Sequence, residues 1–248
     1  MKITEHIYVV GGGKWGFGIS HEIDCNVFMI DTGSGLVLID AGTGLDPERL
    51  DANIESHGFS VKDIKAVVLT HYHGDHACGA ARLQTLSGCE IYAPELEAQA
   101  ILTGDEKATS VALAKGGLYP ADFVYPKSAH VAEVKDGEMI SIGNLVLKAY
   151  LCPGHSLQDM VLFAQIDGKN CLFSGDFVFA HGQVLIQCLP DVSLSPYAEA
   201  MRRIAKLPIE AIFPGHGVFC LENGVSFVEK AVESFDKGLL PQQLYYFT

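Results

Sequence analysis

Four side chains able to bind a metal ion lie within six consecutive residues, in the segment His71-Tyr72-His73-Gly74-Asp75-His76. This segment directly follows AVVLT (66–70), a short and continuously apolar run that predicts a strand buried on both faces. Such a run constrains the fold, because a rigid strand end delivers several polar side chains to one edge of a sheet. We therefore expect a buried sheet with a polar site at its edge.

Three more candidate ligands follow apolar runs and lie beside glycine: His155 in CPGHS, Asp176 in FSGDF and His216 in FPGHG. Glycine lets the backbone bend tightly around an ion, and imidazole and carboxylate ligands without thiolates suit Zn²⁺, Mn²⁺ or Fe²⁺. An isolated loop histidine is usually an ordinary residue, but five of the ten histidines lie in these segments. The seven candidates are His71, His73, Asp75, His76, His155, Asp176 and His216. They exceed what one tetrahedral ion binds and suit two ions that share a carboxylate.

Strand-like and helix-like runs follow one another in the same way in both halves of the chain. In the first half we expect strands at 3–10, 25–31, 36–40, 66–70 and 90–93, and helices at 47–57, 77–86 and roughly 94–115. In the second half we expect strands near 139–142, 145–151, 160–165, 170–173 and 211–213, and helices near 196–207 and 225–237. This order predicts an α/β protein in which two sheets pack together with helices outside. We expect a single domain over residues 1–248, with a helical insertion at about 94–127.

The charge balance and the cysteine pattern indicate which partners and which cellular location to expect. Lys plus Arg number 17 and Asp plus Glu number 30, so the net charge is −13, which suits neither nucleic acid nor an anionic membrane. No apolar run approaches the roughly 20 residues of a membrane-spanning helix, and the charged first ten residues do not resemble a secretory leader. Seven cysteines without a CxxC pair favour reduced thiols. We expect a soluble, cytoplasmic protein whose partner is a small-molecule substrate.

The motifs together resemble those of a known family. THYHGDH (70–76) matches the HxHxDH motif of the metallo-β-lactamase superfamily, and PGHS, SGD and PGH recur in that family's order and approximate spacing. With LIDAG at 38–42, the resemblance covers nearly the whole chain. It implies an αβ/βα four-layer sandwich, in which two mixed β-sheets are flanked by helices and the site lies at the rim between the sheets.

The resemblance also implies a ligand set. It assigns to one ion His71, His73 and His155, and to a second ion Asp75, His76 and His216, with Asp176 as the bridge. Two Zn²⁺ per chain are expected, with Mn²⁺ or Fe²⁺ as alternatives. Asp40 matches an earlier Asp of the family that supports the metal loops, although a cap at a strand end explains it about equally well.

This arrangement implies hydrolysis of a small ester, lactone or thioester by a metal-bridging hydroxide, with Asp75 as a candidate proton relay. Asp176 stands where β-lactamases of this fold carry Cys or lack a bridging ligand, which argues against antibiotic hydrolysis. Glyoxalase II-like thioester hydrolysis is weakened because FVFAHGQVLIQ (177–187) replaces that branch's Cys-Gly-Arg segment. Lactonase-like hydrolysis is weakened because Phe179 replaces a Tyr. The alternative from another class is a mononuclear-iron, persulfide dioxygenase-like oxidoreductase.

Candidate substrate contacts come from two segments and from the region after Asp176. The glycine-rich segment 11–20 carries Trp15 and Phe17, and the insertion carries Tyr119; both segments are able to cover a site, or to pack at the edge of the sandwich or against a subunit. Phe179 and His181 are further candidates, with an exposed loop position as the alternative for His181. The apolar run GLLPQQLYYFT (238–248) either packs back on the core or meets a neighbouring subunit, so a homo-oligomer is one expectation.

Overall fold

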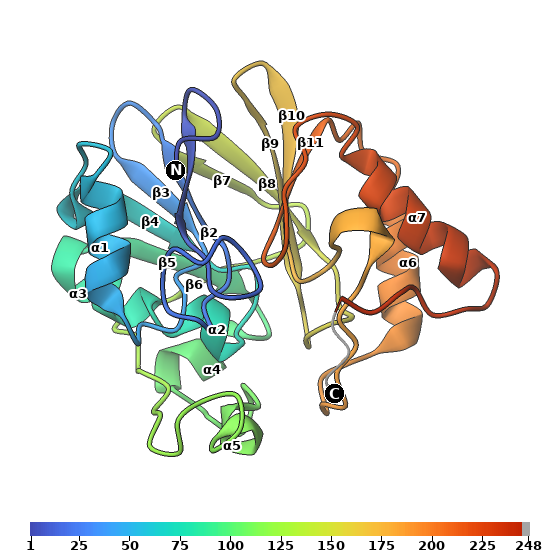
Figure 1. Ribbon diagram of the computed structural model, residues 1–248, viewed down its shortest axis with the longest axis horizontal. Helices are drawn as coiled ribbons and strands as arrows, with labels where there is room; N and C mark the ends of the chain where they lie inside the picture. Colours follow the sequence, from blue (N-terminus) through green and yellow to red (C-terminus); the bar gives the residue numbers. More distant parts are fainter. Residues whose placement is uncertain (245–248) are drawn as a thin grey trace.

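Two β-sheets face each other at the centre of the molecule, and helices cover their outer faces (Figure 1). The computed structural model describes residues 1–244. Within that range the first sheet has the order β1 (Ile7–Gly11), β2 (Val27–Asp31), β3 (Leu36–Ile39), β4 (Ile64–Val68), β5 (Glu90–Pro94) and β6 (Ala132–Val134). The second has the order β11 (Ala211–Pro214), β10 (Lys169–Gly175), β9 (Met160–Ile166), β8 (Leu145–Leu151) and β7 (Met139–Ile142).

Both sheets are mixed. In the first, β1, β2 and β3 pair antiparallel, and β3 to β6 pair parallel. In the second, β7 to β10 pair antiparallel, and β11 joins β10 in parallel. Because β4, β5 and β11 are parallel to a neighbour, their carboxyl ends lie at the same rim as those of β3 and β10. That rim is where the polar motifs follow the strands.

Helices pack on the two outer faces. The helices and 3₁₀ turns are α1 (Pro47–Glu55), η1 (Val61–Asp63), α2 (Gly74–Ala77), α3 (Ala80–Ser87), α4 (Ala98–Thr103), α5 (Val111–Ala114), η2 (Ala180–Gly182), α6 (Leu194–Ile204) and α7 (Val225–Asp236). One buried cluster joins α1 and α3 to the first sheet, and another joins α6 and α7 to the second. This order of layers confirms the predicted αβ/βα sandwich. No helix in the described part of the chain has the length and apolarity needed to cross a bilayer.

The middle layer of the core lies between the sheets. Phe28 from β2 contacts Phe173 and Phe213 from β10 and β11, at ring-centroid distances of 5.8 and 5.4 Å. All three rings are buried. Burial of aromatic side chains from both sheets holds the sandwich closed and places the carboxyl ends of β4 and β10 near each other.

The helix expected over 94–115 is wrong in part. The structure has two short helices there, Ala98–Thr103 and Val111–Ala114. The first ends at Gly104, which has a left-handed backbone (φ +66°) that glycine adopts at little cost. Ser110 also has a positive φ, of 59°, so the chain turns again before the second helix. The Ala- and Leu-rich composition favoured a continuous helix, and these two turns interrupt it.

Smaller differences occur at other elements. The helix expected at 77–86 is α3, which begins at Ala80, and the separate short helix α2 before it carries part of the polar motif. The first strand begins at Ile7, and the strand Ala132–Val134 was not expected. The C-terminal run pairs through Gln243 with Val184, while residues 245–248 of that run lie outside the described residues.

Candidate metal centre

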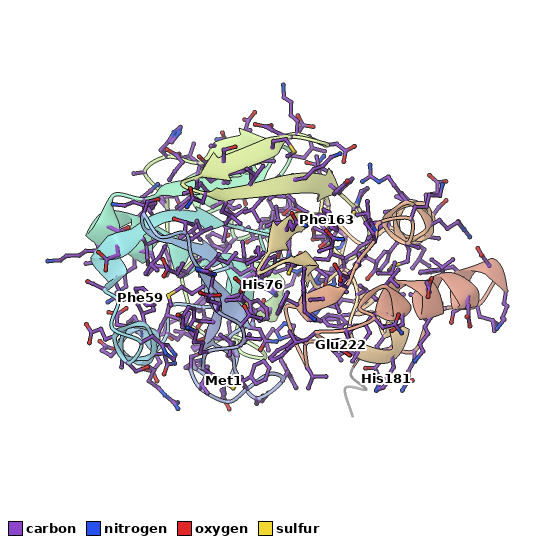
Figure 2. The ribbon with its side chains drawn as sticks, turned by 90° about the horizontal axis from the view of Figure 1, so that it is seen from above. Met1, Phe59, His76, Phe163, His181 and Glu222 are labelled. Carbon is purple, nitrogen blue, oxygen red and sulfur yellow. The ribbon has the colours of Figure 1, made fainter. Side chains whose placement is uncertain are left out.

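All seven predicted ligands meet at the rim between the two sheets. The segment after β4 and helix α2 supply four of them, and the loops after β8, β10 and β11 supply one each. Figure 2 shows His76 deep in the molecule, where the blue strands of the first sheet approach the yellow strands of the second. All seven side chains are buried. Strand ends from both sheets therefore build one polar centre inside an otherwise apolar protein.

Three histidines form the first group. His73 Nδ1 lies 3.0 Å from His155 Nε2. The ring centroid of His71 lies 4.7 Å from that of His73 and 5.0 Å from that of His155. One ligand atom from each lies within 4.8 Å of the other two, a spacing that suits a shared ion.

The second group combines a carboxylate with two imidazoles. Asp75 Oδ2 lies 3.2 Å from His216 Nε2 and 3.7 Å from His76 Nε2. Their candidate ligand atoms also lie within 4.8 Å of one another. This set of one oxygen and two nitrogens suits a second divalent ion.

Asp176 lies between the two groups. Its Oδ1 is 3.2 Å from His76 Nε2, while its Oδ2 is 3.5 Å from His216 Nε2 and 3.6 Å from His155 Nε2. One carboxylate therefore faces ligand atoms of both groups, as a bridging ligand must.

The buried polar atoms of this centre fit a bound cation. His71 Nε2, His76 Nε2 and Asp176 Oδ1 are buried and make no hydrogen bond within the protein. Each such atom costs about 1–3 kcal/mol when left unsatisfied in an interior. These three residues offer ligand atoms within 4.8 Å of one another, an arrangement that a bound divalent ion would satisfy.

Burial and neighbouring charges shift the pKa values of several predicted ligands. Burial alone raises the pKa of Asp176, but His216 and His76 outweigh burial and hold that pKa well below its usual value. The same balance, with His76 the main opposing neighbour, lowers the pKa of Asp75 to about 2. Burial, aided by the neighbouring histidines, lowers the pKa of His71 well below its usual value. Burial alone lowers the pKa of His76, but Cys25 and Asp176 outweigh burial and raise that pKa well above its usual value. Ionised carboxylates and a neutral His71 are forms that bind metal, whereas a metal ion at His76 would displace its proton.

Comparison with known proteins agrees with this geometry. The family model described as the metallo-beta-lactamase superfamily matches residues 22–216. The chain belongs to the metallo-β-lactamase superfamily. Within that superfamily it is similar to the lactamase-like protein nscB of Aspergillus fumigatus, with 28% identity over 215 residues, or 85% of this chain and 52% of nscB. It is also similar to an atrochrysone carboxyl ACP thioesterase of the same species, with 28% identity over 84% of this chain and 55% of that protein.

This chain thus spans about half the length of these curated relatives. Solved structures of superfamily members share its fold. A B3 metallo-β-lactamase with an active-site glutamic acid superposes with a TM-score of 0.70, at 24% identity, over 94% of this chain and 86% of that one. A metallo-β-lactamase of Cronobacter sakazakii superposes with a TM-score of 0.72, at 20% identity, over 96% of each chain.

Hydrogen bonds to Asp40 orient the ring of His76 and fix the start of the histidine-rich segment. Asp40, whose backbone has a positive φ of 62°, accepts a hydrogen bond of 2.8 Å from His76 Nδ1. It also accepts the backbone N–H of Thr70 at 2.8 Å. Asp40 therefore holds the histidine-rich segment in place, in agreement with the expectation that Asp40 supports the metal loops.

A cavity of about 350 Å³ opens from the metal centre. Its floor includes His73, Asp75, His155, Asp176 and His216. The segment 94–127, which the sequence predicts as an insertion, supplies Leu113, Leu118 and Tyr119 to one wall, and residues 185–189 supply a second wall. Trp15 also lines the cavity, so two of the expected substrate contacts, Trp15 and Tyr119, lie where a substrate would bind.

The other expected contacts lie away from this cavity. Phe17 packs against Phe219, with ring centroids 5.6 Å apart, because it belongs to the partly buried edge of the core between the sheets. Phe179 is fully buried and does not line the cavity, and its ring centroid lies 6.3 Å from that of His216. His181 is exposed at the periphery (Figure 2) and has a positive φ of 63° in η2, in agreement with the exposed loop position.

Tyr119 also supports the metal centre. Its hydroxyl donates to Asp75 Oδ1 at 3.1 Å and accepts the backbone N–H of Asp75 at 3.1 Å. Its ring stacks on Phe123, with centroids 4.8 Å apart. The insertion therefore contacts a predicted ligand directly, in addition to forming a wall of the cavity.

Two carboxylates near the ligands were not anticipated. Asp191 Oδ2 accepts hydrogen bonds from His73 Nε2 at 3.1 Å and from the Tyr72 hydroxyl at 2.9 Å. Glu97 is fully buried and accepts the backbone N–H of Tyr72 and the hydroxyl of Ser156, at 2.8 and 2.7 Å. Neither Asp191 nor Glu97 lies in a glycine-flanked motif, so no local signal in the sequence points to them.

Proposed function

We propose that this protein is a metal-dependent hydrolase that uses two divalent ions to cleave a small ester, lactone or thioester with an apolar, uncharged acyl group. The position of Asp176 supports this best, because its two oxygens face both groups of ligands on the floor of a cavity. Two ions held this way supply Lewis acidity and lower the pKa of water. Zn²⁺ is the proposed metal, with Mn²⁺ or Fe²⁺ as alternatives.

Asp75 is the proposed proton relay. It lines the floor of the cavity, and the Tyr119 hydroxyl fixes its Oδ1 while Oδ2 faces His216. A carboxylate fixed in this way beside the reacting atoms accepts a proton from the attacking water and returns it to the leaving group. Asp75→Asn should lower turnover by about 100-fold or more, with a much smaller effect on folding. The exposed Asp122→Asn variant is the control, and equal turnover in both variants would contradict this role.

The cavity lining supports an apolar acyl group. Leucines project from both walls, and no Lys or Arg is found among the described lining residues. A carboxylate or phosphate on the acyl side would lose its hydration without gaining a charged partner, which is costly. One relative's name, an ACP thioesterase, supports a thioester as one of the candidate bonds.

The deciding experiment measures metal content by mass spectrometry on anaerobically purified protein, with turnover of ester, lactone and thioester panels on the same sample. We expect two ions per chain and hydrolysis of at least one panel. One iron per chain, with oxygen consumed only when a persulfide is added, would contradict the hydrolase and favour the persulfide dioxygenase-like oxidoreductase. A cytoplasmic location fits the free cysteines and is part of the proposal; a homo-oligomer stays a prediction from the sequence.

A further inference from the structure

The segment 184–191, between η2 and α6, contacts two of the metal-centre histidines. The carbonyl oxygen of Leu185 accepts a hydrogen bond of 2.8 Å from His155 Nδ1. Asp191 Oδ2 accepts one from His73 Nε2. The same segment forms one wall of the cavity. Its position therefore determines both the shape of the cavity and the orientation of these two rings.

This segment is held in place by the last described residues of the chain. The backbone N–H of Val184 donates to the Gln242 carbonyl at 3.0 Å, and the N–H of Leu244 donates to the Val184 carbonyl at 2.8 Å. The N–H of Ile186 donates to the side-chain oxygen of Gln243 at 2.8 Å. In Figure 1 the chain after α7 turns back, so that its last described residues lie beside the loop that precedes α6.

The hydrogen bond to Gln243 involves the peptide group between Leu185 and Ile186. The N–H of Ile186 and the carbonyl of Leu185 belong to the same planar trans peptide, so they point in opposite directions. Gln243 Oε1 binds one side of this group, and His155 Nδ1 binds the other. Two hydrogen bonds on opposite sides of one rigid plane fix its rotation, and they also polarise each other.

The orientation of this peptide matters for His155. Because Nδ1 donates to Leu185, the proton is kept on that nitrogen and the lone pair of Nε2 faces His73 and Asp176. Outer partners of this kind set the tautomer and ring orientation of metal-binding histidines. The Gln243 amide is itself held by a 3.1 Å bond from its Nε2 to the Pro241 carbonyl.

We propose that Gln243 is a positioning residue for the metal centre, which orients His155 through the 185–186 peptide. The inference rests on the metal-binding part of the proposed function. A residue about thirty positions after the last predicted ligand thereby becomes part of the active site. A mere anchor of the chain end would stabilise the fold without any effect on metal affinity.

Three full-length variants test this. Gln243→Leu removes the acceptor at similar size, Gln243→Glu keeps an acceptor oxygen, and Gln242→Leu changes the exposed neighbour, whose contribution is a backbone carbonyl. Zn²⁺ affinity is measured by competition with a chromophoric chelator, and the exchange rate of the Ile186 amide is measured by hydrogen–deuterium exchange. Neither readout requires a substrate.

We expect Gln243→Leu to weaken Zn²⁺ binding by about 10–100-fold, the range typical of outer partners of metal ligands, and to speed exchange at Ile186. Gln243→Glu should restore affinity to within a few-fold, and Gln242→Leu should match the wild type. Unchanged affinity in Gln243→Leu, or failure of Gln243→Glu to restore it, would overturn the inference while leaving the proposed function intact. A wild-type protein that binds Zn²⁺ without any hydrolysis would refute only the proposed function. A wild type that binds none of Zn²⁺, Mn²⁺ and Fe²⁺ would refute both.

Discussion

Gly215 gives a sharp test of how tightly the metal centre is packed. A Cβ added at this position would lie 2.4 Å from Asp176 Oδ1 and 2.6 Å from His76 Cε1. Contacts of Cβ atoms below 3.0 Å are essentially never seen, so Asp176 Oδ1 would have to retreat by about 0.6 Å, or the loop by the same amount. Metal sites tolerate displacements of only about 0.5 Å before they lose their geometry.

We therefore expect Gly215→Ala to fold and to lose function. Overpacking of this kind costs about 1–3 kcal/mol of stability, whereas a misplacement of about 1 Å at a reacting centre costs on the order of 100-fold in rate. Metal content by mass spectrometry should fall below that of the wild type, and turnover should fall by about 100-fold. Urea unfolding followed by circular dichroism checks that the variant is folded.

Gly217→Ala is the matched control in the same loop. A Cβ there meets no atom within 4 Å, although its φ of +73° imposes a backbone cost. That cost should lower stability by about 1 kcal/mol with little effect on metal content. Full metal content and near-normal turnover in Gly215→Ala would refute the argument that Asp176 must occupy its observed position.

Three other changes have defined outcomes. Asp191→Ala removes the acceptor for His73 Nε2, so Zn²⁺ affinity should fall by about 10–100-fold in a chelator competition, and by less in Asp191→Asn, which keeps one acceptor. Burial, reinforced by Asp159, raises the pKa of Glu97 from 4.5 to about 8. Its contribution to stability is thus fully present below pH 4.5 and is lost as the pH rises through about 8. Glu97→Gln cannot titrate, so the wild-type free energy of unfolding minus that of the variant should decrease between pH 5 and pH 9. Leu118→Arg places a cation in the apolar cavity wall and should shift preference by about tenfold, equivalent to about 1.4 kcal/mol, towards acyl chains that end in a carboxylate.

Each of these predictions has an outcome that would contradict it. Equal affinity in wild type and Asp191→Ala would show that the contact with His73 does not orient the ring. Parallel unfolding free energies at both pH values would show that Glu97 is ionised in the folded protein throughout that range. Leu86→Arg, on the exposed side of α3, should leave acyl preference unchanged. The same shift in Leu86→Arg and Leu118→Arg would contradict the argument that the cavity wall sets the acyl preference.

The sequence by itself determined the fold class and predicted the ligand set. The seven ligand positions carry a local signal, because each follows an apolar strand and most adjoin a glycine that permits a tight bend. The strand-and-helix order, repeated in both halves, predicted two sheets with outer helices, and the structure confirms it. Composition also favoured one long helix after residue 94. In the structure, turns of the backbone at Gly104 and Ser110 interrupt this helix.

Apart from Asp40, only the tertiary structure decided which residues support the metal centre. Asp191 contacts His73 across 118 positions of sequence, and Gln243 contacts Ile186 across 57. Such bonds depend on how separate loops pack against each other, and a single aspartate or glutamine in a loop has no periodicity or flanking pattern that reports a distant partner. Strand ends place the ligands through local chain geometry, whereas the contacts that orient those ligands arise when the sandwich closes.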